Sequence, residues 1–233
     1  EVLIILLISL FFTSTLFSKE VNFKAVEILT YEEGNIIVGK NEVEAKIENE
    51  VEIFADKITY NKKKEKIIAE GNVRSIDLMN NIEIKSKEAI FYKNKNQIIT
   101  TGETFFKINK DYSGQSSDVH FYINEKIIFS EKLSSFEDNY NNLIQVQSFR
   151  YSNNSQVLKA NDIKFIDNKK NKYFLKKGFL KTKENILIGK DIKINLINDT
   201  FGQPDNDPKL KGNSVVYENN KTLIKKGIFT SCK

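Results

Sequence analysis

The sequence is poor in the residues that cross-link, kink or catalyse. Its 233 residues include no tryptophan, two prolines, one histidine and one cysteine. The single cysteine, Cys232, cannot build a disulfide framework within the chain, so stability must come from strand pairing and apolar burial. One histidine and one cysteine also fall short of the three or four ligands that a zinc site usually needs. Small disulfide-stapled and zinc-dependent proteins are therefore disfavoured.

Catalytic motifs are equally scarce. The only histidine, His120, lies in a strand-like run with no acid or nucleophile at a recognisable spacing, so we expect it to be incidental and to face away from the core. No glycine-rich loop follows a strand and opens a helix. Carboxylates are plentiful, so a polysaccharide hydrolase with an acidic pair stays an alternative. Asp199, Asp205 and Asp207 share a loop, which we interpret as solvated rather than calcium-binding. We predict no catalytic residue, metal or cofactor.

The one long apolar run stands at the start of the chain. Residues 2–17 are uncharged and almost wholly apolar, and Ser18 and a polar chain follow. The run is short for a bilayer core of about 30 Å, and it resembles the apolar region of a secretory signal. We predict a signal peptide over residues 1–18, with an uncleaved anchor as the alternative, and export of residues 19–233. The absence of Met and of a basic segment leads us to expect the true start upstream.

The charge balance is mildly basic. Without residues 1–18 the chain carries 36 basic and 30 acidic residues, a net charge of +6. We interpret the lysines as spread along the chain, with runs such as Lys62–Lys64 and Lys169–Lys170 beside asparagines in expected turns. A nucleic-acid-binding protein would gather basic residues in one patch with aromatic residues between them. We therefore interpret the lysines as solvated turns and protected strand edges, and we predict no nucleic-acid partner.

An internal repeat of about thirty residues is the main positive signal. Its members share an apolar residue two positions before an aromatic one, a polar turn, two apolar residues and then glycine. The copies are residues 55–73, 86–104 and 212–229, with looser ones at 160–179 and 25–43. Two strands with one apolar face cannot bury themselves, so successive units must stack around a shared core. With no helical spacing after residue 18, we predict an all-β fold of a dozen or more strands and essentially no helix.

Alternation within each unit assigns side chains to faces. Ile58 and Tyr60 share one face, and the return strand turns Ile67, Ala69 and Val73 toward the same side. Gly71 marks a bend or bulge. Carried into the next unit by matching tyrosines, the pattern predicts an apolar interior that either fills a core or holds an apolar ligand. Its candidate residues are Ile58, Tyr60, Ile67, Ala69, Val73, Ile90, Tyr92 and Ile98.

The middle third, residues 105–158, fits the repeat poorly. Strand-like segments remain at Val119–Ile123, Lys126–Phe129 and Leu143–Tyr151, between irregular turns at Asp111–Gln115 and Ser134–Asn142. The longest clear loop, Asp199–Lys209, holds both prolines. An unpaired cysteine in an exported protein suggests a partner elsewhere, so we expect the chain to continue past Lys233.

The repeat units resemble a known family. The patterns A-D-x-I-x-Y…I-x-A-x-G-N-V at 55–73 and S-x-E-A-x-x-Y…I-x-T-x-G at 86–102 are similar to the OstA-type repeats of lipopolysaccharide transport proteins. That family includes the periplasmic bridge LptA, the membrane-anchored LptC and the periplasmic N-terminal domain of the translocon LptD. The ending Gly-Ile-Phe-Thr-Ser-Cys at 227–232 is similar to the aromatic-Thr-x-Cys that closes the LptD domain before its barrel. The middle third departs from the pattern.

The resemblance implies a V-shaped, open β-jelly roll over residues 19–233 whose interior holds the acyl chains of lipopolysaccharide. It implies a domain at the periplasmic face of the outer membrane. The domain would accept lipopolysaccharide from an LptA-type bridge by edge-strand pairing, and would meet an LptE-type lipoprotein through a following barrel. Cys232 would correspond to the family cysteine that bonds to a barrel cysteine. The alternatives are a soluble LptA-like bridge, a secreted β-solenoid enzyme acting on polysaccharide, and a structural surface protein.

Overall fold

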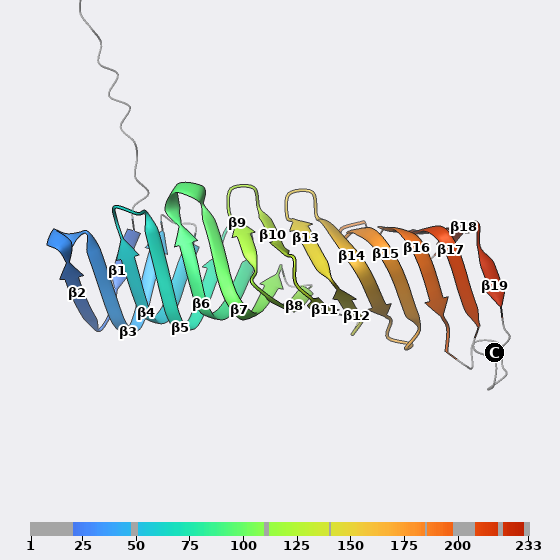
Figure 1. Ribbon diagram of the computed structural model, residues 1–233, viewed down its shortest axis with the longest axis horizontal. Coiled ribbons are helices and arrows are strands. Elements are labelled where there is room, and N and C mark those ends of the chain that lie inside the picture. Colours follow the sequence, from blue (N-terminus) through green and yellow to red (C-terminus); the bar gives the residue numbers. More distant parts are fainter. Residues whose placement is uncertain are drawn as a thin grey trace, which may run out of the picture.

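The computed structural model describes residues 21–47, 51–109, 112–139, 141–184, 186–197, 208–218 and 221–230. They form an elongated body in which antiparallel strands lie across the long axis and follow the chain from one end to the other (Figure 1). In these ranges the helical elements are two short 3-10 segments, η1 (Glu32–Gly34) and η2 (Lys93–Lys95). No described helix is long and apolar enough to cross a membrane. The predicted all-β class is confirmed; the predicted signal segment lies outside the described residues.

The strands fall into three groups along the body. The N-terminal group consists of β1 (Val21–Lys24), β2 (Glu27–Tyr31), β3 (Ile36–Ile47), β4 (Val51–Asn61), β5 (Lys66–Asp77), β6 (Ile82–Tyr92) and β7 (Gln97–Ile108). The middle group consists of β8 (Tyr112–Ser117), β9 (His120–Tyr122), β10 (Ile127–Ser130), β11 (Ser134–Asp138), β12 (Leu143–Val146) and β13 (Ser148–Ser152). The C-terminal group consists of β14 (Val157–Ile166), β15 (Lys172–Lys181), β16 (Ile186–Asn195), β17 (Lys209–Glu218), β18 (Lys221–Lys225) and β19 (Ile228–Thr230).

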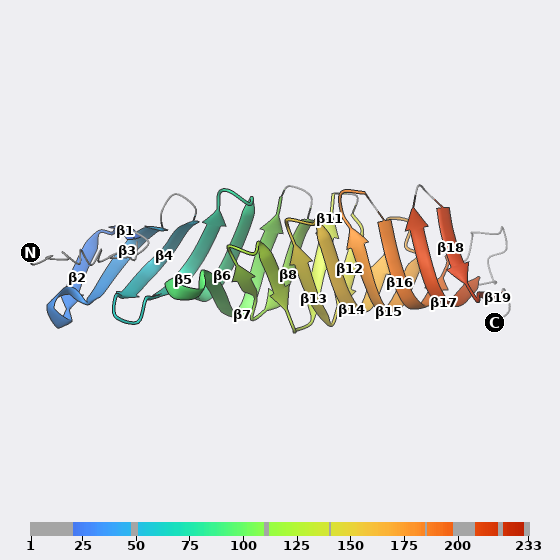
Figure 2. The same cartoon turned by 90° about the horizontal axis from the view of Figure 1, so that it is seen from above.

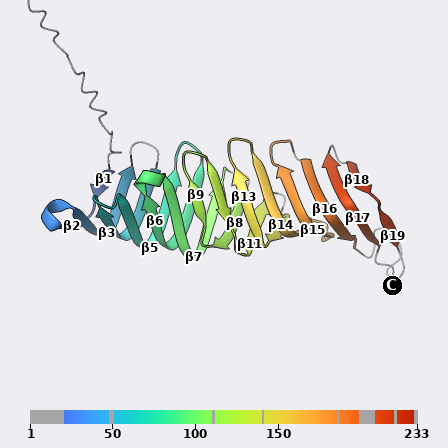
Figure 3. The ribbon, with the colours of Figure 1, turned by 45° about the horizontal axis from the view of Figure 1, so that its top comes forward.

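Each long strand belongs to two layers. In the N-terminal strands the pairing register shifts halfway along, for example between Lys40 and Val43 of β3 and between Glu70 and Val73 of β5, whereas the pairings of β14 to β17 keep one register across the bend. One half of each long strand pairs in sheet A, with β2, β9, β10, β13 and β18; the other half pairs in sheet B, with β1, β8, β11, β12 and β19. The two layers are visible in Figures 2 and 3. We call the line of bends between them the spine.

Left-handed backbone marks the spine. Gly71 and Gly102 have φ of 76° and 74°, and Asp162 and Asp191 have φ of 48° and 54° at corresponding bends. Glycine adopts this conformation without the strain that other residues meet. A Cβ added at Gly71 would also collide with the carboxylate of Asp56. The prediction that Gly71 marks a bend is confirmed.

The turns of sheet A stack on one another through the backbone. In each, an early amide donates to the carbonyl that ends the preceding turn. The bonds are Lys62 N to Asn35 O (2.8 Å), Lys93 N to Glu65 O, Ile123 N to Asn96 O, Asn153 N to Lys126 O and Thr182 N to Gln156 O (each 2.9 Å). The ladder recurs about every thirty residues, so the repeat continues through the whole described body.

The middle third therefore carries the repeat, contrary to expectation. The segments predicted as irregular turns contain two strands, β8 and β11, which pair with each other through Phe136 and Gly114. Serine and glycine make these strands look like turns in the sequence. Their small size leaves room for a cluster of aromatic rings, because a Cβ at Gly114 would collide with Phe106. In that cluster the ring centroids of Phe106 and Phe149 lie 5.4 Å apart, and the Phe136 ring packs edge-on against both.

Candidate functional site

An unbroken row of neighbouring side chains crosses the inner face of sheet A. Each member is the direct cross-strand partner of the next, and all are apolar or aromatic. The row is Ile37, Tyr60, Ile67, Phe91, Ile98, Phe121, Ile128, Tyr151, Leu158, Leu180, Leu187 and Tyr217. With strands about 4.8 Å apart, twelve such residues span about 50 Å.

Sheet B carries a second row that faces the first. Only Ser75 and Gly114 interrupt its apolar character. The row is Phe23, Ala45, Ile53, Ser75, Ile84, Phe106, Gly114, Phe136, Ile144, Phe165, Tyr173, Ile194, Leu210 and Phe229. Buried members of both rows belong to one apolar cluster. The interior is thus a long apolar seam with no charged side chain in either row.

Most of the sequence-predicted interior residues lie in this seam. They are Ile58, Tyr60, Ile67, Ala69, Val73 and Ile98, all buried. Ile90 and Tyr92 do not: they pair with Ile68 and Lys66 on the outer face of sheet A, while Ala89 and Phe91 point inward. Matching the units by tyrosine caused the slip, and a shift of one residue reverses a side chain's face. When the two units are aligned on Gly71 and Gly102 instead, Phe91 takes the position that corresponds to Tyr60.

Polar groups approach the seam at its margins. Lys93 is buried at η2, and its ammonium donates a hydrogen bond to the Tyr60 hydroxyl at 3.0 Å. At the far end of sheet B, the Tyr173 hydroxyl donates to Oδ2 of Asp167 at 3.0 Å. Burial, and then this bond to a carboxylate, raise the pKa of Tyr173 to about 12. These groups sit near turns, so they border the seam without crossing it.

The free rims of the two sheets meet opposite the spine. There the Asn153 side chain, from a turn of sheet A, donates to the backbone oxygen of Asn80, in a turn of sheet B, at 3.4 Å. No strand pairing joins the two rims among the described residues. Parting them would therefore break side-chain contacts and leave both sheets intact. The seam is closed by side-chain packing.

Other predicted features lie elsewhere. His120 is on the outer face of sheet A, as expected, where its ring stacks on Phe129 at 4.8 Å and Nδ1 lies 3.3 Å from Nε2 of Gln97. No cluster of metal-ligating side chains occurs in the described ranges. Cys232 and the loop acids Asp199, Asp205 and Asp207 lie outside those ranges.

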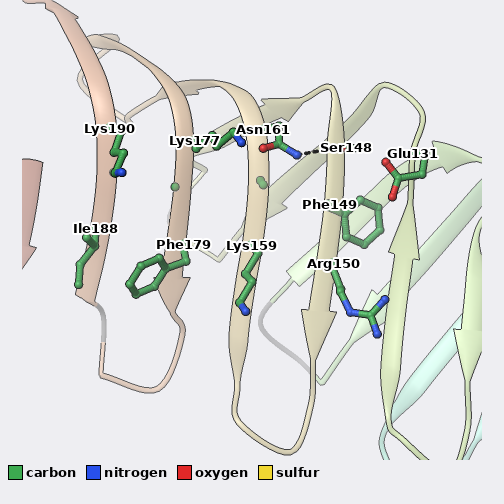
Figure 4. A pocket seen from close by; sticks show the side chains of 13 residues that line it. Glu131, Ser148, Phe149, Arg150, Lys159, Asn161, Lys177, Phe179, Ile188 and Lys190 are labelled. Atoms are coloured by element: carbon green, nitrogen blue, oxygen red, sulfur yellow. Dashed lines mark hydrogen bonds between the residues drawn. The ribbon is translucent and has the colours of Figure 1, made fainter. Parts of the chain in front are cut away.

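Sequence reasoning missed a groove of about 460 Å³ on the outer face of sheet A, over β13 to β16 (Figure 4). Its floor is the backbone of Ala160, Gly178 and Gly189, which are aligned across β14, β15 and β16 between two rows of outward-facing side chains. Lys177 and Lys190 stand along one side of the groove, and hydrophobic and basic side chains along the other (Figure 4). Pairing the strands by their glycines would have revealed this row.

The distribution of charge also corrects an expectation. Residues 21–108 hold 14 basic and 15 acidic side chains, whereas residues 143–230 hold 17 basic and 8 acidic ones. Net charge is thus −1 in the N-terminal half and +9 in the C-terminal half. The basic excess is gathered at one end instead of being spread along the chain.

No family model matches the sequence, and no curated protein sequence matches it. Among solved structures, one similar fold is LptH, described as the LptA-homologous periplasmic component of the conserved lipopolysaccharide transport device from Pseudomonas aeruginosa. The two chains are 8% identical, with a TM-score of 0.43 over 47% of this chain and 80% of LptH.

Proposed function

We propose that this protein carries lipopolysaccharide, holding the acyl chains in the seam between sheets A and B. The observation that supports this most strongly is the pair of facing apolar rows, which run the length of the described body without a charged member. A catalytic groove for polysaccharide would need converging carboxylates. A lipid track needs the opposite: continuous apolar contact and no fixed charge.

Lipid entry replaces one apolar contact by another. In the lipid-free protein, side chains such as Ile67 and Phe91 fill the seam themselves. When the rims part, acyl chains take the place of contacts between the sheets, and each buried CH₂ contributes about 0.8 kcal/mol. The free energy of this exchange is similar at every position along the seam, because each position offers a similar apolar surface. A lipid can therefore move lengthwise without meeting a deep trap.

The role that fits this arrangement best is that of a periplasmic bridge. The two ends of the body present edge strands: β2 pairs with β3 at one end, and β18 pairs with β17 at the other. An edge strand can pair with a strand of another protein and continue the sheet, which would join the seams of neighbouring molecules. Exposed Ile28 and Leu223 on these strands add apolar contact at the junctions.

A second candidate role is the lipid-accepting domain of an outer-membrane translocon. The feature that favours it is the segment at 227–232, whose aromatic-Thr-x-Cys pattern resembles the one that closes the LptD domain. Ile228–Thr230 of this segment form β19. In that role Cys232 would bond to a cysteine further along the chain. Sequencing the gene beyond Lys233 distinguishes the two: several hundred residues of amphipathic strands would support the translocon, and an early stop the bridge.

Adjacent isoleucines on β5 allow a matched crosslinking experiment. Ile67 points into the seam and Ile68 points outward from the same strand. Each is replaced in turn by benzoylphenylalanine, and the protein is irradiated with purified lipopolysaccharide. We expect an adduct from position 67 and little or none from position 68. The same contrast is expected between positions 91 and 90.

Circular dichroism of each variant checks that the added ring leaves the sheets folded. Equal or stronger crosslinking from position 68 would place the lipid on the outside and overturn the proposal. So would folded variants that give no adduct from either position 67 or position 91.

A further inference from the structure

Five lysines gather on the outer face of sheet B near the C-terminal end. Lys164, Lys193 and Lys211 lie in one cross-strand row, and Lys172 and Lys209 in the row beside it. We call this group the lysine face. The positions next to these lysines in the two rows hold Gln145, Ile166, Phe174 and Asn195, and the nearest acidic residue in either row is Glu137, opposite Leu143.

The lysine face has no acidic partners in the described part of the chain. None of its five ammonium groups takes part in an ion pair there. Nζ of Lys193 lies 6.0 Å from the centroid of the Phe174 ring. Lys193 also stands directly opposite Lys211 across the strands. Like charges in that position destabilise a sheet, so stability does not account for this arrangement.

Apolar side chains share the same surface. Ile228 continues the first row and is 69% exposed, and Leu143, which follows Ile166 in the second row, is 37% exposed. Lysines with interspersed apolar residues, spread over a face about 20 Å wide, suit a broad anionic surface better than a single small anion. A discrete anion would call for a concave site with converging donors.

We infer that the lysine face docks on an anionic lipid bilayer. Each lysine near such a surface contributes about 1 kcal/mol of electrostatic attraction, and exposed apolar side chains add to it. Lysine suits this use because its ammonium is a compact charge on a flexible stem, with no fixed geometry to match. The inference stands on charge and topology and does not depend on what the seam carries.

Vesicle binding tests the inference. The full chain is mixed with vesicles of phosphatidylcholine alone or with 30% phosphatidylglycerol, and the ratio of the two partition coefficients is measured by sedimentation. The apolar residues 2–17 are common to all variants and affect both vesicle types. Changing all five lysines of the lysine face to glutamine should lower the ratio by at least about 100-fold. Raising the salt from about 0.1 to 0.5 M should weaken wild-type binding strongly.

A second five-charge variant is the matched control. It changes lysines of sheet A to glutamine, on the other outer face: Lys159, Lys177, Lys190, Lys221 and Lys225. We expect its ratio to fall less than about 5-fold. Equal losses in the two variants would show that net charge alone matters, and a larger loss in the control would move the docking face to sheet A. Binding to an acidic protein but not to anionic vesicles would likewise overturn the inference.

Discussion

The two halves of the body share an interior and differ on the outside. In the N-terminal half, the outer face of sheet B holds basic and acidic residues together, with ion pairs such as Lys46–Glu52 at 3.0 Å and Arg74–Glu83 at 2.6 Å. The corresponding rows of the C-terminal half hold the lysine face. Inside, both halves continue the same two apolar rows.

This difference separates what the fold needs from what the surface does. Exposed ion pairs contribute about 0–1 kcal/mol each, so a sheet can lose them and still fold. The seam is where most of the stabilisation lies, because it removes apolar area from water along the whole body. Paired charges on one half and unpaired lysines on the other are therefore compatible with one architecture.

The largest expected effect is on the seam itself. Ile67 in the N-terminal half is fully buried, and Ile163 in the C-terminal half is slightly more accessible, at 8%. Ile67→Ala should lower the free energy of unfolding by about 4 kcal/mol and Ile163→Ala by about 2 kcal/mol, because a better-enclosed site leaves a larger cavity. Urea denaturation of each variant measures the change.

The matched control for this pair is Ile68→Ala, on the outer face beside Ile67. Its cost should stay below about 1 kcal/mol. If Ile163→Ala proved as costly as Ile67→Ala, the packing of the two halves would be equally tight and the contrast between them would be confined to the surface.

The next effect concerns the bends of the spine. Gly71 and Gly102 have nearly the same left-handed φ, but a Cβ at Gly71 meets Asp56 and one at Gly102 meets nothing within 4 Å. Gly102→Ala should therefore cost about 1 kcal/mol from backbone strain, and Gly71→Ala about 2–3 kcal/mol from strain plus collision. Thermal unfolding ranks the two variants. Equal costs would show that the Asp56 side chain moves aside freely.

In the C-terminal half, the bends of β14 and β16 have aspartate where those of β5 and β7 have glycine, so a substitution there should have the opposite effect on stability. Asp162 and Asp191 adopt left-handed φ at the spine. Asp191→Gly should relieve strain and leave stability unchanged or higher by up to about 1 kcal/mol, the opposite sign to Gly71→Ala. A loss on Asp191→Gly would mean that its carboxylate makes a contact worth more than the strain.

The sequence predicted the period, the strand content and the face of Ile58, Tyr60 and Ile67 correctly, because alternation and turn chemistry are local properties. It failed at Tyr92, where the choice of anchor shifted the alignment by one residue. Glycine at the bend fixes the backbone path, whereas an aromatic residue can occupy either face of a sheet. Anchoring on glycine would have avoided the slip.

The surface features could not be obtained from the sequence in the same way. The lysine face assembles residues from β14 to β17, and its rows exist only once the strands are paired. Along the chain these lysines are separated by buried residues such as Ile192 and Leu175 and look like ordinary outward positions. Counting charge by halves would have shown the +9 excess, but not the face on which it lies.

A double substitution in the N-terminal half tests whether unpaired cations there can also bind an anionic bilayer. Glu52→Gln with Glu83→Gln removes the acids that now pair with Lys46, Arg74 and Lys85. We expect the affinity for anionic vesicles to rise about 10-fold, since the freed charges can act on the bilayer. Stability should fall by less than about 1 kcal/mol at neutral pH. An unchanged affinity would mean that only the C-terminal half can reach the membrane.

The smallest effects should appear as opposite responses of the halves to pH. In the N-terminal half, the hydrogen bond from Arg74 keeps the pKa of Glu83 below its usual value. The stabilisation is therefore present above the pKa of the unfolded chain and is lost as the pH falls through the folded value. Glu83→Gln should flatten the acid limb of a stability profile measured by urea denaturation between pH 3 and 6.

In the C-terminal half the response lies at alkaline pH. The pKa of Tyr173 is raised in the folded state from its ordinary 10.0 to about 12, so the folded chain keeps this proton to a higher pH than the unfolded chain. Between these values the unfolded chain has lost a proton that the folded chain retains, so stability falls as the pH rises. For a half-buried hydroxyl the difference should amount to about 1 kcal/mol. Comparing wild type with Tyr173→Phe separates this from lysine titration, which both share. If both lost stability equally between pH 10 and 12, the hydroxyl would ionise as freely in the fold as in the unfolded chain, and the alkaline sensitivity would belong to the lysines.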